Sequence, residues 1–217
     1  MPVRYVTDAE ARSIIDLDEC NDIIEGLFRD EYNGQVENKP TVELAVPKGG
    51  VFRIKAGGTY GYNTFGFKAY PFGGRYLITV YDLDTGLDGM VEARGLTEAR
   101  TGAVSAIGTK YMARQDATTM GIIGTGREAR AQLASICRVR PFKLIKAYSR
   151  SEENRNTFAR EMTEKLGIEV VPVATSREAV HNVDVLTLIT SASEPVFDGH
   201  DLSDGTHING VSATTMN

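Results

Sequence analysis

The fold of this chain is decided by the stretch Gly121-Ile-Ile-Gly124-Thr-Gly126-Arg-Glu-Ala129, which follows an apolar run and opens into a helical pattern. In this G-x-G-x-x-A spacing, Gly124 permits a tight turn and Gly126 lets the backbone approach a pyrophosphate. Ala129 keeps the helix close to the sheet, and the helix N-terminus offers free amides to phosphates. The stretch therefore predicts a dinucleotide-binding turn rather than an incidental glycine turn. The residues expected to bind the cofactor here are Gly124, Thr125, Gly126, Arg127, Glu128 and Ala129.

The chain around and after this turn alternates strand and helix patterns. Strands are expected at residues 118–123, 144–148, 168–173, 183–189 and 206–211. Helices are expected at residues 127–137, 152–166 and 176–181. Such alternation gives a parallel, doubly wound sheet, so we predict an α/β fold with a Rossmann-type domain over residues 115–217. We expect this domain to be incomplete at its C-terminus, because a doubly wound sheet normally adds one more strand.

The first part of the chain has a different pattern. A capping box at Thr7 and Glu10 begins a helical region, and a second helix follows until Asn33-Gly34. Short strands with tight turns come next and imply a mainly antiparallel sheet; they are expected at residues 41–46, 51–56, 65–70, 75–81 and 87–93. A long amphipathic helix over residues 97–114 closes this part. We therefore predict an N-terminal α+β domain over residues 1–114.

Composition excludes several classes of function. The net charge is −5 and the pI is about 5.3, which argues against nucleic acid as a partner. The basic run at residues 138–143 is interpreted as a solvated connection. No apolar run approaches the roughly 18 residues that span a membrane, and the first residues lack a signal-peptide pattern. Isolated cysteines and unpaired histidines predict no metal site and a reducing, cytoplasmic location.

The end of the second Rossmann strand indicates which dinucleotide is bound. An acidic residue there, about 20 residues past the glycines, would bind the ribose hydroxyls of NAD. This chain has Ser149, Arg150 and Ser151 instead. No carboxylate repels a 2′-phosphate, and Arg150 can pair with one through its guanidinium. NADP(H) is therefore the preferred cofactor, with NAD(H) as the alternative, and a surface role for Arg150 stays open.

Five segments together resemble the ornithine cyclodeaminase/mu-crystallin family over essentially the whole chain. They are residues 66–68, 96–106, 121–129, 190–196 and 207–211. Members of that family continue past the position of Asn217 with a C-terminal segment that returns to the first domain. Their first domain contains the substrate pocket and forms a dimer interface. The resemblance therefore implies that residues 1–114 are a substrate-binding and dimerisation domain, and that the protein is a homodimer.

The resemblance gives individual residues a role. Lys68 and Arg100 match the positions that hold the substrate carboxylate in the family's pocket. A strand lysine and a helix arginine can converge on one anion, with the arginine as a bidentate fork. Fixing the carboxylate orients Cα against the nicotinamide. Thr190, Ser191 and Val211 match positions at the nicotinamide end.

Three departures separate this chain from the family's cyclodeaminases. Arg53 stands where those enzymes carry an acidic residue useful for a diamino substrate, and Lys55 faces the same side of the strand. An upstream arginine that helps bind the carboxylate is replaced near Thr41, so Arg53 is a candidate for that task. The cyclodeaminases carry an aspartate shortly after the fifth strand. This chain has Thr214 at about that position, and a threonine cannot act as acid or base near neutral pH.

These features favour an NAD(P)-dependent oxidoreductase that moves hydride between the nicotinamide and Cα of a small amino or imino acid. Within the family, the departures match ketimine reductases and alanine-type dehydrogenases. Two alternatives remain open. One is ornithine cyclodeaminase, which converts L-ornithine to L-proline and ammonia. The other is a mu-crystallin-like protein that binds NADPH and a small ligand without turnover.

Overall fold

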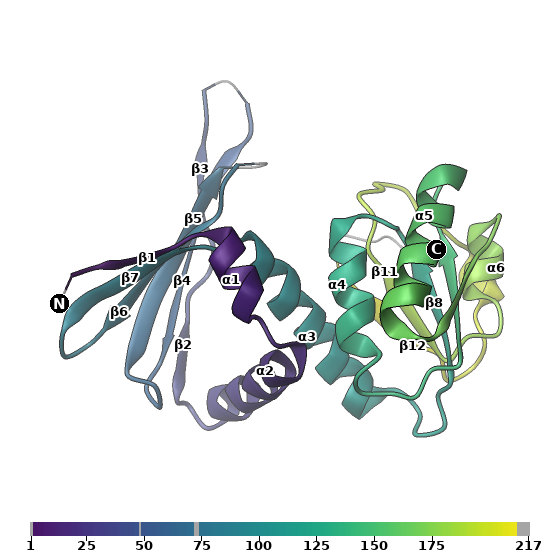
Figure 1. The fold of residues 1–217 in the computed structure, drawn as a ribbon, viewed down its shortest axis with the longest axis horizontal. Helices are drawn as coiled ribbons and strands as arrows, with labels where there is room; N and C mark the ends of the chain where they lie inside the picture. The colour runs from purple at the N-terminus through teal and green to yellow at the C-terminus, as the bar shows by residue number, and fades with distance from the viewer. Residues whose placement is uncertain (1, 48, 72–73, 212–217) are drawn as a thin grey trace. The chain divides into compact units, whose positions relative to one another are not determined.

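The computed structural model describes residues 2–47, 49–71 and 74–211, and its contacts divide the chain into two compact units (Figure 1). The division lies between Thr97 and Glu98, inside helix α3 (Arg94–Met112). The sequence placed the domain boundary after this helix, at residue 114. The later turns of α3 pack instead on the second unit, since a Cβ on Gly102 would meet the Ser135 side chain at 2.6 Å. The helix is thus shared by both units.

Within the described residues, the first unit contains a seven-stranded sheet of order β1-β7-β6-β5-β4-β2, with β3 paired to β4. The strands are β1 (Arg4–Val6), β2 (Val36–Asn38), β3 (Val42–Ala45), β4 (Val51–Thr59), β5 (Thr64–Pro71), β6 (Leu77–Asp82) and β7 (Gly86–Glu92). The pairs are antiparallel except for β1 with β7. The predicted block of strands is therefore confirmed. The sequence does not predict β1 and β2, because three residues are too few for alternation to show.

Helices α1 (Asp8–Ile14) and α2 (Leu17–Tyr32) belong to the same unit as this sheet. Thr7 and Glu10 form the predicted capping box, in which each side chain accepts a hydrogen bond from the other's backbone amide. Helix α3 begins three residues before the predicted position. A backbone amide in its first turn, that of Gly95, has a partner outside the helix, because it donates to the Asp8 carboxylate at 2.7 Å.

The second unit contains a parallel sheet of order β10-β9-β8-β11-β12, which is five-stranded within the described residues. Its strands are β8 (Thr119–Ile123), β9 (Leu144–Tyr148), β10 (Glu169–Pro172), β11 (Val185–Leu188) and β12 (His207–Gly210). The helices are α4 (Arg127–Ile136), α5 (Glu152–Leu166) and α6 (Ser176–Val180), with a 3-10 turn at Gly199–Asp201. The order reverses between β8 and β11, as in a doubly wound fold. The predicted Rossmann-type fold is therefore confirmed.

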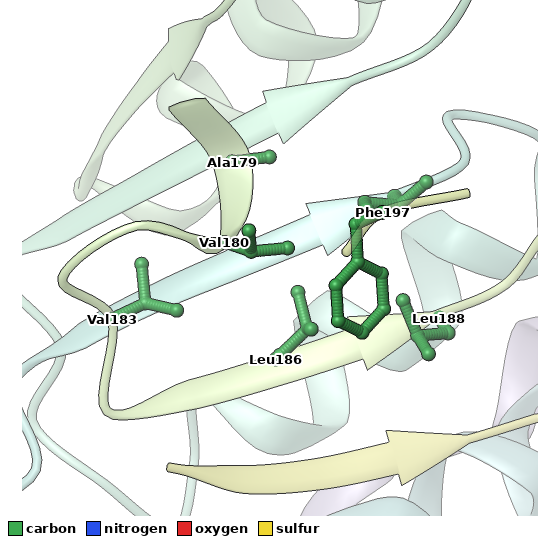
Figure 2. Close-up of a cluster of buried hydrophobic side chains, with 7 residues drawn as sticks. Ala179, Val180, Val183, Leu186, Leu188 and Phe197 are labelled. Atoms are coloured by element: carbon green, nitrogen blue, oxygen red, sulfur yellow. The ribbon is translucent and has the colours of Figure 1, made fainter. Parts of the chain in front are cut away.

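A buried apolar cluster packs α6 against β8 and β11 (Figure 2). Its members are Ile123, Ala179, Val180, Val183, Leu186, Leu188 and Phe197. Figure 2 shows the Phe197 ring beside Leu186 and Leu188, both of which are fully buried. Burying each leucine contributes about 2 kcal/mol. Phe197 thereby anchors the far end of the loop that follows β11 and carries Thr190 and Ser191.

The basic run at residues 138–143 is a solvated connection at Arg138 and Lys143, which are exposed as the sequence predicted, but not at Arg140. Arg140 is only 9% exposed, and its guanidinium donates to the carbonyls of Lys110 and Ala113 at 2.7 and 3.3 Å. These carbonyls lie in and just after the last turn of α3, where helix carbonyls are typically satisfied from outside the helix. Arg140 is therefore the C-terminal cap of α3. A pattern of cations alone carries no signal for this, because the partners lie about 30 residues away.

We expect Arg140→Ala to lower the free energy of unfolding by about 2 to 3 kcal/mol, since it strands several buried carbonyls. Urea denaturation followed by circular dichroism measures this loss. The matched control is Lys143→Ala, because Lys143 is exposed in the same run and its loss should change stability by less than about 0.5 kcal/mol. Equal stability of the two variants would contradict the capping role.

Candidate functional site

The glycine turn follows β8 directly, and its first glycine has no substitute. Gly124 has a φ of 108°, and a Cβ there would lie 2.1 Å from the carbonyl oxygen of Ile189. Its amide donates to the carbonyl of Tyr148 at 2.8 Å, which ties the turn to the end of β9. Backbone strain and crowding both exclude a side chain here. The turn is thus held between the ends of β9 and β11.

The next glycine leaves space at the start of α4. Gly126 is the N-cap of α4 with an ordinary φ of −76°, and a Cβ there would meet nothing within 4 Å. No side-chain hydrogen bond caps this helix. Its first amides therefore have the positive dipole end and the open space that a pyrophosphate requires. Ala129 is fully buried, which allows the close approach of helix and sheet. These residues fit a dinucleotide.

The end of β9 is linked to the glycine turn by side chains. The Thr125 hydroxyl donates to the Ser149 hydroxyl at 2.8 Å, and Ser149 donates to the carbonyl of Ser151 at 3.1 Å. Ser151 is also the N-cap of α5, accepting from the Asn154 amide. Arg150 is exposed between the two serines. Its guanidinium is consequently available to solvent at the position expected to meet a ribose 2′-substituent.

Two arginines of α4 have roles that the sequence did not indicate. Arg130 donates to the carbonyls of Thr125 and Gly126 at 3.0 and 3.1 Å. It also pairs with Glu161 and lies over the Phe158 ring at 5.3 Å. Arg130 therefore braces the glycine turn from behind. Arg130 follows Gly126 by four residues and Thr125 by five, and this spacing along a helix is the signal that could have indicated the contact.

The side chain of Arg127, by contrast, is engaged in an ion pair within the second unit. It forms an ion pair of 2.7 Å with the carboxylate of Glu98, which is buried on α3. The contribution of Arg127 to a phosphate site would therefore come from its backbone amide rather than its charge. Glu128 follows it in the first turn of α4.

The remaining residues predicted for the cofactor lie at the carboxyl ends of β11 and β12. The Thr190 hydroxyl accepts from the Ala192 amide at 3.1 Å, and the Val211 amide donates to the Leu188 carbonyl at 3.0 Å. Ser191 is exposed. Because the strands are parallel, these residues share one edge of the sheet with the glycine turn and with Ser149 to Ser151. That edge is where dinucleotides bind in this fold class.

The first unit gathers cations on one face of its sheet. Lys55 of β4 lies directly opposite Lys68 of β5, and Arg53 lies opposite Tyr70. Residues directly opposite in an antiparallel pair share a face, so all four belong to the same surface. Like charges directly opposite each other are destabilising on their own. An anion bound near both lysines would offset this repulsion.

Arg53 has a partner that the sequence did not indicate. Glu43 of β3 lies opposite Arg53, and its carboxylate accepts from the Arg53 Nε at 2.6 Å. This hydrogen bond, with the accompanying charge attraction, raises the pKa of Arg53. The expected surplus of positive charge at Arg53 is thus largely offset by Glu43. The cationic character of this face is carried instead by Lys55 and Lys68.

The Lys68 ammonium is held by neighbours within the first unit. Its Nζ donates to the Thr97 hydroxyl at 2.7 Å and lies 4.8 and 4.4 Å from the ring centroids of Tyr70 and Tyr76. Thr97 in turn donates to the Ala93 carbonyl at 2.6 Å, which leaves an oxygen lone pair for Lys68. Arg100 is exposed on α3, one helical turn after Thr97.

Some expected features fall outside this description. Thr214 lies outside the described residues, and Thr41 is exposed just before β3. Across the described residues, no group of three or more His, Cys, Asp or Glu side chains has the arrangement of a metal site. The helices formed by those same residues include none that is long and apolar enough to cross a membrane.

Comparison with known proteins gives a consistent result. The sequence model of the ornithine cyclodeaminase/mu-crystallin family matches residues 3–217. A Delta(1)-pyrroline-2-carboxylate reductase of Bacillus cereus is 36% identical over 142 residues, which is 65% of this chain and 43% of the reductase. The alanine dehydrogenase of Archaeoglobus fulgidus is 30% identical over 223 residues, covering 98% of this chain and 68% of the dehydrogenase.

A solved structure agrees over nearly the same extent. The Delta(1)-pyrroline-2-carboxylate reductase of Thermococcus litoralis, in complex with NADH and L-proline, superimposes with a TM-score of 0.89 and 32% identity. The match covers 95% of this chain and 68% of that chain. The chain matches less than half the length of the Bacillus reductase and about two thirds of the other two proteins.

Proposed function

The chain belongs to the ornithine cyclodeaminase/mu-crystallin family, and we propose that it carries the cofactor and carboxylate sites of an NAD(P)-dependent oxidoreductase acting on a small amino or imino acid. The observation that carries this proposal is the opposition of Lys55 and Lys68 on one face of the first unit. A substrate carboxylate offsets that repulsion. The reductase and dehydrogenase relatives act on substrates of this class by name, which supports the same choice.

In the proposed reaction, the residues of this chain bind and orient the substrate. Lys68 and Arg100 hold the carboxylate, and Lys55, opposite Lys68, adds positive charge to the same face. Arg53 supports them from its pair with Glu43. When bound, the nicotinamide cofactor supplies or accepts the hydride at Cα. Lysine or water provides the proton for the nitrogen. Orientation of Cα is the main contribution that hydride transfer needs from the protein.

The proposed cofactor is a nicotinamide dinucleotide held at the glycine turn, with NADP(H) preferred. Arg150 supports this preference because it is exposed at the end of β9, where this chain has no acidic residue. We expect Arg150→Asp to lower the ratio of kcat/KM for NADPH over NADH by about 100-fold, through loss of a charge-assisted contact to the 2′-phosphate and gain of repulsion.

Steady-state kinetics with both cofactors measure this ratio. Arg160→Asp is the matched control, since Arg160 is an exposed arginine on α5 and its charge reversal should leave the ratio within about twofold of wild type. If Arg150→Asp also leaves the ratio unchanged, another group reads the ribose.

The experiment that tests the proposed function supplies the full-length protein with NADPH and a cyclic imino acid, or with a keto acid plus ammonia. We expect oxidation of NADPH and formation of the matching amino acid. A parallel reaction contains L-ornithine and a catalytic trace of oxidised cofactor. Proline and ammonia from this second reaction, without net change in the cofactor, would replace the reductase with a cyclodeaminase.

One observation favours the cyclodeaminase as second candidate. Glu43 brings a carboxylate to the same face as Lys68, where a diamino substrate would need an acidic partner. Its pairing with Arg53 reduces that attraction, so the reductase remains first. Tight cofactor binding with no turnover on any imine would indicate the mu-crystallin-like binding protein.

We also propose that the intact protein is a homodimer formed through the first unit. Val42 and Leu44 of β3 and Phe67 of β5 are exposed on the face of the sheet opposite to Lys68. An exposed apolar sheet face is typical of an interface. The cytoplasmic location stays a prediction.

A further inference from the structure

We propose that Tyr70 and Tyr76 are positioning residues that clamp the Lys68 ammonium and so set the affinity of the carboxylate site. This inference deepens the proposed function and rests on it. The sequence singled out Lys68 but neither tyrosine, and the clamp lies entirely within the first unit.

The two rings form a fixed pair around the lysine. Their centroids lie 4.8 Å apart at an interplanar angle of 63°, an edge-to-face contact that is favourable in itself. The Lys68 Nζ lies within 5 Å of both centroids, well inside the range of cation–π attraction. Each ring therefore restrains the other as well as the ammonium.

The strand register explains why these residues meet. Tyr70 lies two residues after Lys68 on β5, so both side chains leave the same face of the sheet. The pairing of Ala69 with Leu77 places Tyr76 next to Tyr70 across the β5–β6 pair. The guanidinium of Arg94, the first residue of α3, lies 5.7 Å from the Tyr76 centroid and donates to the Gly74 carbonyl at 3.4 Å. Tyr76 is thus packed between a strand and the start of a helix.

A ring clamp suits a lysine that must bind an anion. The lysine side chain is a flexible four-carbon stem with a compact charge, and ordering it has an entropic cost. An acidic partner orders such a side chain but offsets its charge, as Glu43 does for Arg53. An aromatic ring attracts the ammonium and leaves its net charge available to a carboxylate. The two rings consequently order the Lys68 side chain before the substrate binds, so that binding the carboxylate loses less conformational entropy.

The test compares Tyr76→Leu with Tyr76→Phe in the full-length protein. Leucine removes the ring, while phenylalanine keeps it and loses only the hydroxyl. We expect Tyr76→Leu to raise KM for the imino acid by about tenfold with a smaller effect on kcat, and Tyr76→Phe to restore KM to within about twofold. The dissociation constant of NADPH, measured by fluorescence, should stay at the wild-type value in both. Tyr60→Leu is the control, since it removes a ring that pairs with Phe65.

A second measurement needs no turnover. In protein labelled with 13C at the lysine ε-carbon, the Lys68 signal should be displaced upfield by the two rings, and Lys68→Arg identifies it by its loss. Tyr76→Leu should reduce that displacement, and Tyr60→Leu should not. An undisplaced signal overturns the clamp, as does a Tyr76→Leu variant with wild-type KM or a Tyr76→Phe variant as impaired as Tyr76→Leu. A displaced signal in a wild-type protein that reduces no imino acid would instead overturn the proposed function.

Discussion

Replacing Lys68 by alanine is expected to lower kcat/KM for the imino acid by about a thousandfold, the effect of removing a charged partner from a buried carboxylate. Lys68 is half-buried, and its ammonium is held by Thr97 and two rings, so alanine removes a charge that is already positioned. The glycine turn belongs to the other unit. Cofactor affinity should therefore be nearly unchanged, and isothermal titration with NADPH measures it.

Two further variants sharpen this expectation. Lys68→Arg should recover little activity, because the longer, planar guanidinium places its donors at other positions than the compact ammonium that donates to Thr97 at 2.7 Å. Lys39→Ala should behave as wild type, since Lys39 is an exposed lysine that pairs with Glu37. If Lys68→Ala lost cofactor binding and turnover to the same degree, the lysine would support the fold rather than the substrate.

The second large effect separates the two glycines of the turn. Gly124→Ala should destabilise the second unit by about 3 kcal/mol, because its positive φ and the Ile189 carbonyl at 2.1 Å both oppose a Cβ. Gly126→Ala should fold with nearly wild-type stability, since its Cβ would enter open space. That space is where the pyrophosphate is expected, so Gly126→Ala should weaken NADPH binding by about 100-fold.

Thermal unfolding and NADPH titration on both variants decide between these roles. The expected pattern is a lowered Tm for Gly124→Ala and a raised dissociation constant at unchanged Tm for Gly126→Ala. Wild-type NADPH affinity in Gly126→Ala would mean that the dinucleotide does not approach the start of α4. In that case the fit of this helix end to a phosphate would have no functional meaning.

The Rossmann unit was largely predictable from the sequence because its signals are local. Helix α5 and strand β9 have the predicted bounds, since apolar runs and a serine N-cap mark them within a few residues. The glycine turn is equally local, because φ and crowding act on single positions. Short strands such as β1 give no such signal, since their pairing partner lies far along the chain.

The candidate site was predictable only in part, because many of its contacts join residues that are far apart in the sequence. Lys68 lies in a motif that the sequence shows. Its neighbours, however, are set by the register of β4 and β5 and by the position of the first turn of α3. The pairing of Arg53 with Glu43 likewise depends on register between β3 and β4, which the sequence does not specify. The capping of α3 by Arg140 joins residues about 30 positions apart. A charged residue with no evident partner in the sequence is therefore a weak guide to the net charge of the folded site.

Hydride transfer between the nicotinamide and Cα of a small amino or imino acid is the reaction that we propose. Its most direct test supplies the full-length protein with a cyclic imino acid and NADPH deuterated at C4, using each stereoisomer in turn, and locates the label by mass spectrometry and proton NMR. The account predicts one deuterium at Cα of the amino acid formed, from one of the two stereoisomers. Amino acid formed with no deuterium at Cα from either stereoisomer, or no product from any imino acid, would contradict it.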